Sequence, residues 1–412
     1  MSTATTTATT TSTPTASGRS TTAPTAPPPD TTAPFDRHAC DLDDFRALIE
    51  DQPVLAPSAS DVRLGVPVYE ADRLRARIAS EGDRPLRDEL ARVLHEGPGI
   101  YVLAGSLDHD VVDAASAEFR AMIDQQHAEG RQVGDHYAKP GANDRVWNAI
   151  EKLASQAPSV FVDYYLNDMI ALGALAWLGP AYQISSQVNV VNPGGQAQSP
   201  HRDFHLGFMT DDVAEDYPRH THLLSPALTL QGAVAHCDMP VETGPTMYLP
   251  HSQKYPLGYL AWRRPEFVEY FEQHRTQLPI GKGDVVFFNP ALFHAAGSNV
   301  TTDVKRMANL LQISSAMARA METMDRIAMS AAIYPELLAR RAAGTPDDAL
   351  LRAATAAADG YAFPTNLDRD PPLGGLTPPS HLDIVMEALR EGASPEALGE
   401  RLDALVERRR SH

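Results

Sequence analysis

Apolar positions in the first part of the chain recur at spacings of three and four residues, the period of an amphipathic helix. This pattern begins near residue 68 and stops at Gly97-Pro98-Gly99, where glycine and proline interrupt it. Two further helices are expected over residues 111–127 and 164–178, each followed by a glycine. The short apolar run at 100–104 indicates a buried strand between them. Helices therefore dominate the prediction up to residue 183.

The pattern changes between residues 184 and 315, where short runs of Val, Ile, Leu and Phe alternate with Pro, Gly and Asn. Strands are expected at 188–191, 227–235, 285–288 and 307–313. Such punctuation, without long helices between the runs, predicts a mostly antiparallel sheet closed as a sandwich or barrel. The fold class expected is a mostly β core with flanking α-helices.

The sequence after residue 315 becomes rich in Ala, Leu, Arg and Glu and returns to a helical pattern, interrupted by a loop at about 360–380. Ser394-Pro395-Glu396 predicts the start of a last helix, with an N-cap serine and a first-turn proline. Residues 1–34 contain 14 Thr and 6 Pro and no aromatic residue, which predicts a disordered tail. We therefore expect one domain over 35–412, with a helical region at 35–183, a β core at 184–315 and a helical region at 316–412.

Charge and cysteine content narrow the class of protein. The chain has 35 Lys+Arg and 53 Asp+Glu, a net charge of −18, and its one strongly basic run is 408–410. Nucleic acid is thus an unfavourable partner, and the sequence lacks an apolar run long enough to span a bilayer. The two cysteines, Cys40 and Cys237, exclude a disulfide scaffold. We expect a cytoplasmic protein that binds a small molecule.

Three His-x-Asp pairs are candidates for a metal site, because two His and one carboxylate on one face of a redox iron leave other positions open. On a strand, residues two apart share a face. The pair His381/Asp383 begins a predicted helix and is expected to be a surface helix start. The pair His236/Asp238 ends an apolar strand before a turn, which favours a structural role over metal binding. The pair His201/Asp203 remains as the preferred ligand pair.

The segment downstream of 283 supplies the partners for that pair. His294 follows an apolar run and offers a third ligand, and Gly297-Ser298-Asn299 predicts a turn. Arg306, twelve residues after His294, is then expected on the strand beside it, where a guanidinium can hold a carboxylate by two hydrogen bonds.

The sequence resembles the phytanoyl-CoA dioxygenase family of iron(II)/2-oxoglutarate oxygenases over about residues 97–315. Four separated segments carry the resemblance: GIYVLAGSLDHDVVDAASAEFRAMIDQQHAEG, WLGPAYQISSQVNVVNPGGQAQSPHRD, ALTLQGAVAHCDMPVETGPTMYLPHSQK, and the stretch from His294 to Arg306. The resemblance implies a double-stranded β-helix (jelly-roll or cupin-like) core with iron held by His201, Asp203 and His294. It also implies that Arg306 holds the distal carboxylate of 2-oxoglutarate.

The reaction that the resemblance implies consumes 2-oxoglutarate and O2 and releases succinate and CO2. Related halogenases replace the metal-binding acid by a small residue, whereas Asp203 is present here, so hydroxylation, desaturation or cyclisation is favoured over halogenation. The acidic chain has no basic cluster for a nucleotide phosphate, so the substrate expected is a small organic molecule, for example a natural-product intermediate, rather than an acyl-CoA.

Other candidate residues follow from their positions near the motif. Gln187 and Asn189 alternate on one strand and are candidates for binding cosubstrate or substrate, or else for strand pairing. Thr246, Tyr248 and Gln312 are weaker candidates of the same kind, with Thr246 assigned to the cosubstrate. The insertion 204–226 is either a lid over the pocket or a surface loop. Its candidate substrate-binding residues are Phe204, His205 and Phe208. The C-terminal helices either cap the pocket through residues 361–364 or form a homodimer contact.

Two competing functions remain open from the sequence. One is a cupin-type metal-binding barrel acting as a sensor or as a non-oxidative isomerase, and the other is a catalytically silent relative. Arg306 and its spacing from His294 favour the oxygenase, because a simple cupin needs no carboxylate anchor there.

Overall fold

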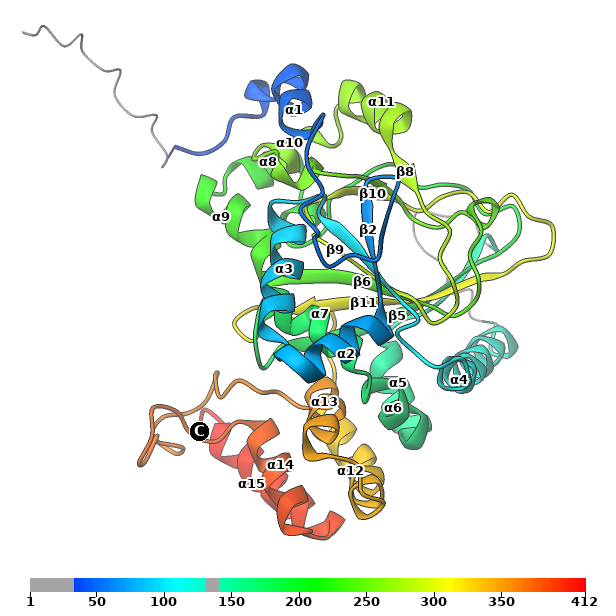
Figure 1. Cartoon of the computed structure of the whole chain (residues 1–412). Helices are drawn as coiled ribbons and strands as arrows, with labels where there is room; N and C mark the ends of the chain where they lie inside the picture. The colour runs from blue at the N-terminus through cyan, green and yellow to red at the C-terminus, as the bar shows by residue number, and fades with distance from the viewer. Residues whose placement is uncertain (1–32, 131–140) are drawn as a thin grey trace, which may run out of the picture.

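The computed structural model describes residues 33–130 and 141–412 of the chain (Figure 1). The tail predicted to be disordered comprises residues 1–34, and all of these except residues 33 and 34 lie outside the described residues. No helix in the described ranges is long and apolar enough to cross a membrane.

The elements before residue 183 are α1 Leu42–Ile49, β1 Asp61–Arg63, β2 Val66–Glu70, α2 Ala71–Glu81, α3 Arg84–His95, β3 Ile100–Ala104, α4 His109–Ala128, β4 Asn143–Val146, α5 Ala149–Gln156, α6 Pro158–Tyr165 and α7 Asp168–Leu178. The middle of the chain forms β5 Gln183–Val191, α8 Asp211–Glu215, α9 Arg219–Leu224, β6 Thr229–Ala235, β7 Met247–Leu249, α10 Gly258–Ala261, α11 Pro265–His274, β8 Thr276–Gln277, β9 Val285–Phe288, β10 Phe293–Ala295 and β11 Arg306–Ser314. The last part forms α12 Arg326–Ala342, α13 Asp347–Ala357, α14 His381–Glu391 and α15 Pro395–Arg409.

The strands form two sheets. The larger has eight strands in the order β1-β2-β3-β9-β6-β11-β5-β4, and the smaller has three in the order β10-β7-β8. All pairs are antiparallel except β2 with β3, which is parallel. The molecule is thus a mixed α/β protein built around a large sheet, with more helix in the middle of the chain than the mostly β prediction allowed.

Strand alternation separates the two faces of the large sheet. On β11, Met307, Leu311 and Ile313 belong to the main hydrophobic core, whereas Leu310 and Gln312 line a cavity on the other face. The period of two along the strand explains this division. One face of the sheet therefore packs against helices, and the other carries the candidate site.

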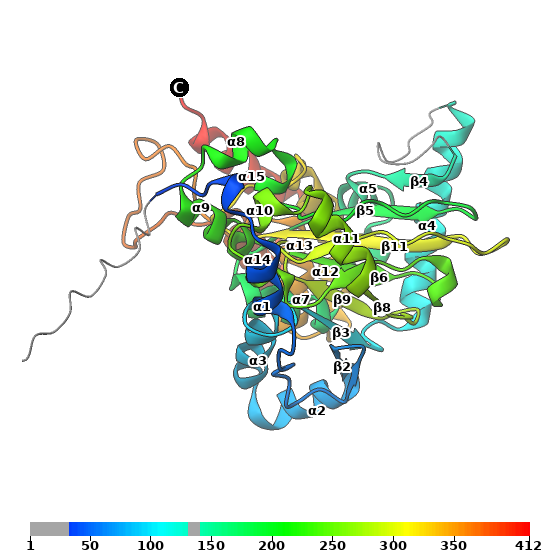
Figure 2. The ribbon, with the colours of Figure 1, turned by 90° about the horizontal axis from the view of Figure 1, so that it is seen from above.

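Helices cover the apolar face. Buried residues of α3–α7 and α12–α15 form a single hydrophobic cluster with that face. Figure 1 shows α12–α15, in orange and red, at one end of the molecule, and in Figure 2, seen from above, α12 and α13 lie behind the strands of the large sheet. Gly173 in α7 lies so close to the sheet that a Cβ there would be 2.3 Å from the Phe287 ring. The lining of the cavity includes no residue of α12–α15 or of 361–364, so capping by that loop stays unsupported, and the homodimer stays a prediction.

The N-terminal region is less helical than the sequence predicted. Strands β1, β2 and β4 were missed, because they are short, and β2 is buried along four of its five residues, which removes the alternating pattern. The single helix predicted at 164–178 is two helices. Asn167 begins the second, since its side chain accepts a hydrogen bond from the Ile170 amide, an N-cap that the sequence did contain.

The structure agrees with the predicted starts of the last two helices. Ser394 caps α15 through the Ala397 amide at 3.2 Å, and Ser380 with Asp383 forms a capping box at the start of α14. His381 is nevertheless buried, with 1% of its surface exposed, so its expected position on the surface was wrong.

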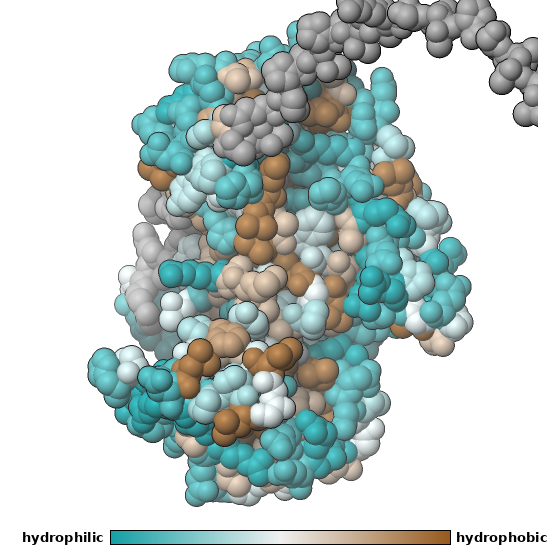
Figure 3. Space-filling view, turned by 90° about the vertical axis from the view of Figure 1, so that its left-hand side faces the viewer, coloured by the Kyte–Doolittle hydropathy of each residue, from teal (hydrophilic) through white to brown (hydrophobic). Residues whose placement is uncertain are grey.

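On the face in Figure 3, apolar side chains gather in separate small patches between polar areas.

His236 has a structural role, as the sequence favoured. Its Nδ1 lies 2.8 Å from the Ser116 hydroxyl and its Nε2 lies 2.9 Å from the Tyr164 hydroxyl. Because Ser116 already donates to the Val112 carbonyl, the imidazole donates from Nδ1 and accepts at Nε2, which is the neutral form.

We expect the free energy of unfolding to fall on acidification from about pH 6.5 towards pH 3. Burial lowers the pKa of His236 to about 3 and that of His381 to about 4, against about 6.5 in an unfolded chain. In this window the unfolded state binds more protons, so acid favours it. Urea unfolding at several pH values should show this slope, and His236→Gln should make it shallower. An unchanged slope would contradict the assignment.

Candidate metal centre

His201 and His294 lie opposite each other on neighbouring chain segments. The two residues exchange backbone hydrogen bonds, with N···O distances of 2.9 and 3.1 Å, and form an isolated antiparallel bridge between His201 and the β10 residue His294. Directly opposed residues share a face, and the two ring centroids are 4.4 Å apart. Backbone pairing thus brings together two residues that are 93 positions apart in the sequence.

The backbone also fixes which nitrogen of each ring faces the cavity. Nδ1 of His201 lies 3.0 Å from the Ser199 carbonyl, and Nδ1 of His294 lies 2.9 Å from the Leu292 carbonyl. A carbonyl only accepts, so Nδ1 carries the proton in both rings and Nε2 keeps its lone pair. Neutral imidazoles held in this way are the usual histidine ligands of a metal.

Asp203 completes the group. Its carboxylate oxygens lie 3.8 Å from Nε2 of His201 and 3.5 Å from Nε2 of His294, and the Gln231 amide donates to it at 2.5 Å. Burial opposes ionisation of this carboxyl, but His201 and His294, when protonated, and the Gln231 amide outweigh it and hold the pKa of Asp203 well below its usual range. A metal ion bound at the two Nε2 atoms would take the place of those protons. The side chain therefore stays an anion, ready to bind a cation.

One nitrogen or oxygen from each of the three residues lies within 4.8 Å of the others. Two imidazole nitrogens and one carboxylate on one side of a gap form the donor set that suits non-haem iron with open positions. The structure thus brings together all three residues that the sequence singled out as metal ligands.

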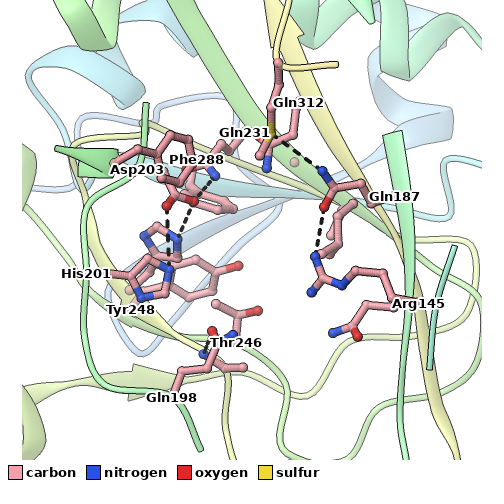
Figure 4. Close-up of a pocket in the computed structure, with 18 of the residues that line it drawn as sticks. Arg145, Gln187, Gln198, His201, Asp203, Gln231, Thr246, Tyr248, Phe288 and Gln312 are labelled. Carbon is pink, nitrogen blue, oxygen red and sulfur yellow. Dashed lines mark hydrogen bonds and ion pairs between the residues drawn. The ribbon is translucent and has the colours of Figure 1, made fainter. Parts of the chain in front are cut away.

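The three residues open into a cavity of about 150 Å³ between the two sheets, shown in Figure 4. Arg306 also lines this cavity and is 6% exposed. Burial lowers the pKa of Arg306 to about 10, which leaves the guanidinium charged at neutral pH. One of its amino groups donates to the Gly244 carbonyl, and it has no carboxylate partner among the described residues. A ligand carboxylate would supply that partner.

The position of Arg306 differs from the sequence prediction in one respect. Its strand, β11, pairs with β5 and β6 in the large sheet, whereas His294 lies in the small sheet. Residues 296–305 cross from one sheet to the other and are tied there by Asn299, whose amide donates to the Val191 and Val304 carbonyls at 3.0 and 2.8 Å. The two residues therefore line one cavity from different sheets, not from adjacent strands.

Most of the other predicted site residues also line this cavity. They are Gln187, Asn189, Thr246, Tyr248, Phe208 and Gln312. Phe204 and His205 are not in its wall. Phe204 is buried and packs edge-on against Phe208, with centroids 5.6 Å apart, and the backbone of His205 donates to the Ser225 hydroxyl at 2.7 Å.

The insertion 204–226 folds into short helices. His222 donates to the Ala214 carbonyl at 2.9 Å within the insertion, and ion pairs of Asp211 with Arg263 and of Glu215 with Arg37 attach it to neighbouring segments. Phe208 is 54% exposed and brings this segment to the cavity. The lid role of the insertion stays a prediction that rests on Phe208.

The sequence did not single out several residues of the cavity wall: Arg145, Trp147, Gln198, Gln231, Phe288 and Met321. Gln231 could have been found from the sequence, because it is a polar residue in an apolar predicted strand. Its side chain also points to the opposite face of that strand from its two neighbours in the chain. Arg145 and Trp147 had no such signal, since β4 was not predicted.

Gln231→Leu is expected to weaken metal binding about tenfold, the usual cost of losing a hydrogen bond that orients a ligand. The variant keeps the volume of the side chain but removes the donor to Asp203. Calorimetric titration with Mn(II) would measure the change. Gln125→Leu, on the exposed surface of α4, is the matched control, and equal affinities in the two variants would contradict a role for Gln231 in holding Asp203.

The donor set, together with the buried arginine in the same cavity, defines the class of non-haem iron, 2-oxoglutarate-dependent oxygenases. The model of one family, phytanoyl-CoA dioxygenase (PhyH), matches residues 96–308, which is more than half of the 412 residues. The chain belongs to the phytanoyl-CoA dioxygenase family, as the sequence predicted. No curated protein matches the sequence.

Several solved structures are similar to the chain at low identity. The alpha-ketoglutarate-dependent epimerase SnoN from nogalamycin biosynthesis is 22% identical, covers 56% of this chain and 82% of its own, and has a TM-score of 0.39. The carbocyclase SnoK from the same biosynthesis is 21% identical over 55% and 83%, with a TM-score of 0.41. HygX from Streptomyces hygroscopicus, solved with nickel, 2-oxoglutarate and hygromycin B, is 15% identical over 55% and 87%, with a TM-score of 0.38.

Proposed function

We propose that this chain is a dioxygenase that binds Fe(II) through His201, Asp203 and His294 and hydroxylates a small organic molecule, such as a natural-product intermediate. The observation that carries the proposal is that these three residues and Arg306 line the same cavity. We further propose that the two sheets form a double-stranded β-helix and that residues 35–412 act as one catalytic domain. The shared hydrophobic cluster of the N-terminal helices, large sheet and C-terminal helices supports a single domain.

The residues of the cavity have separate tasks in this proposal. His201 and His294 present Nε2 because their Nδ1 atoms are held by carbonyls, and Gln231 orients the Asp203 carboxylate. Arg306 holds the distal carboxylate of 2-oxoglutarate, while Asn189 and Thr246 lie on the same wall. When bound, ferrous iron together with 2-oxoglutarate and O2 would supply the oxidising chemistry: one oxygen atom would go to the hydroxylated product and the other to succinate, with release of CO2.

The substrate is held against the remaining wall of the cavity, where Phe208 and Trp147 exclude water from one side. The retained carboxylate of Asp203 supports hydroxylation over halogenation, because it occupies the ligand position that chloride would take. The net charge of −18 supports a small molecule over an acyl-CoA, whose phosphates need a basic surface.

An anaerobic titration tests this proposal. The protein loaded with Fe(II) is expected to develop a weak visible charge-transfer band when 2-oxoglutarate is added, because the keto acid chelates the metal. Absence of the band in folded, iron-loaded protein would overturn the proposal and would favour a metal-binding barrel that does not use 2-oxoglutarate.

A further inference from the structure

Three strands of the large sheet present amide side chains to the cavity in a fixed pattern. Gln312 on β11 pairs in register with Gln231 on β6, and the next inward position on β11, Leu310, pairs with Gln187 on β5. Directly paired residues share a face, and all of these side chains line the cavity. Figure 4 shows Gln231, Gln312 and Gln187 on one side of the cavity, with Arg145 beyond Gln187.

Two of these amides retain hydrogen-bonding capacity. Gln231 donates from Nε2 to Asp203, but its Oε1 is buried without a partner in the described part of the chain. Gln312 has no side-chain hydrogen bond within residues 33–130 and 141–412. Gln187, in contrast, accepts from Arg145 at 2.8 Å and donates to the Met321 sulfur at 3.6 Å. Free hydrogen-bonding groups therefore lie on β6 and β11, next to the metal ligands, and the Asn189 Oδ1 on β5 is likewise buried without a partner among the described residues.

The charges in the wall argue against a charged substrate. Asp203 is the one acidic residue among those that line the cavity, and it is a proposed metal ligand. Arg306 is assigned to the cosubstrate. The guanidinium of Arg145 already donates to Gln187 and lies 4.9 Å from the centre of the Trp147 ring. A cationic substrate would have no carboxylate to pair with, apart from the proposed metal ligand. An anionic substrate would compete with Gln187 for Arg145 or with 2-oxoglutarate for Arg306.

The same wall argues against a purely apolar chain. An alkyl chain beside Gln231 and Gln312 would remove their hydrogen bonds to water and return none, which is unfavourable for buried polar groups. Phe208, Trp147 and Met321 add apolar surface around the amides. The wall thus combines neutral donors and acceptors with carbon-rich faces, which a ring bearing several hydroxyl groups can satisfy at once.

We propose that the substrate is a neutral, hydroxyl-rich molecule, such as a sugar, a cyclitol or a glycosylated compound, bound through Gln312 and Gln231. This inference rests on the proposed function, because it places the substrate beside the metal of that function. Gln312 is the specificity-determining residue, and Gln231 links the substrate to the Asp203 ligand.

Nuclear relaxation tests the substrate class directly. The protein is loaded with Mn(II) and 2-oxoglutarate, and the paramagnetic relaxation of the protons of three probes is compared: methyl β-D-glucopyranoside, octanoate and choline. We expect the glucoside to show the largest enhancement. Greater enhancement of octanoate or choline, or none for the glucoside, would overturn the proposal. The Mn(II) resonance and its response to 2-oxoglutarate are recorded separately, so failure of the proposed function is seen as absent metal or cosubstrate binding.

Variants of Gln312 supply the second arm. Gln312→Leu is expected to weaken the glucoside effect about tenfold, as for one lost pair of hydrogen bonds, with 2-oxoglutarate binding unchanged. Gln312→Asn, which keeps an amide, should retain part of the effect, and Gln125→Leu on the surface of α4 should retain all of it. An equal glucoside effect in Gln312→Leu and Gln125→Leu would overturn the assignment of Gln312.

Discussion

Asp203→Ala and His294→Ala are each expected to abolish succinate formation from 2-oxoglutarate. The three candidate ligands offer one donor atom apiece within 4.8 Å, and two remaining donors bind a divalent metal far more weakly than three. The loss is expected in metal binding and in turnover together. Calorimetric Fe(II) titration under anaerobic conditions and succinate assays measure the two effects.

The choice of control for this experiment depends on the structure. His381→Ala, in another His-x-Asp pair of the sequence, is expected to retain succinate formation when folded, but His381 is 1% exposed and its removal leaves a gap in the core. His109→Ala is better, because His109 is exposed and its ring contacts the Lys282 carbonyl at 3.0 Å. Equal activity in all these variants would show that the metal is bound elsewhere.

Arg306→Leu is expected to raise the concentration of 2-oxoglutarate needed for half-maximal turnover by about a hundredfold or more. The variant removes a buried charge that pairs with a carboxylate, an interaction whose loss costs roughly 2–5 kcal/mol. The 2-oxoglutarate concentration that Arg306→Lys needs for half-maximal turnover should lie between those of Arg306→Leu and the wild type. An ammonium keeps the charge but lacks the two parallel donors of a guanidinium. Steady-state kinetics with varied 2-oxoglutarate measure these values.

Two measurements separate this effect from misfolding. Arg306 also donates to the Gly244 carbonyl, so its substitution can affect stability. The thermal unfolding of Arg306→Leu should therefore be compared with that of Arg275→Leu, which removes an exposed ion pair with Glu272. Metal affinity should stay close to that of the wild type, because Arg306 is not among the candidate ligands. An unchanged requirement for 2-oxoglutarate would show that another residue anchors the cosubstrate.

The sequence pointed to the residues of the candidate metal centre because each carries its own local signal. His201 and Asp203 stand two apart after a glycine- and proline-rich turn, His294 follows an apolar run, and Arg306 begins one. Gln231 was missed although its strand was predicted, because a glutamine in a strand has many roles and sequence spacing does not reveal that it faces Asp203. Arg145 was missed with its whole strand, since β4 gains its backbone partners from β5, about forty residues later.

The sequence by itself determined the change from a helical to a strand-rich and back to a helical region, the inward and outward positions on the long strands, and the four polar residues expected to bind metal and cosubstrate. These features depend on periods of two and of three to four residues, which are local. Tertiary structure alone decided that His294 and Arg306 face one cavity from different sheets, that His381 is buried, and that Gln312 lies beside Gln231. Register and sheet order arise from pairing between distant segments, and local patterns carry no information about which distant strand supplies the partner.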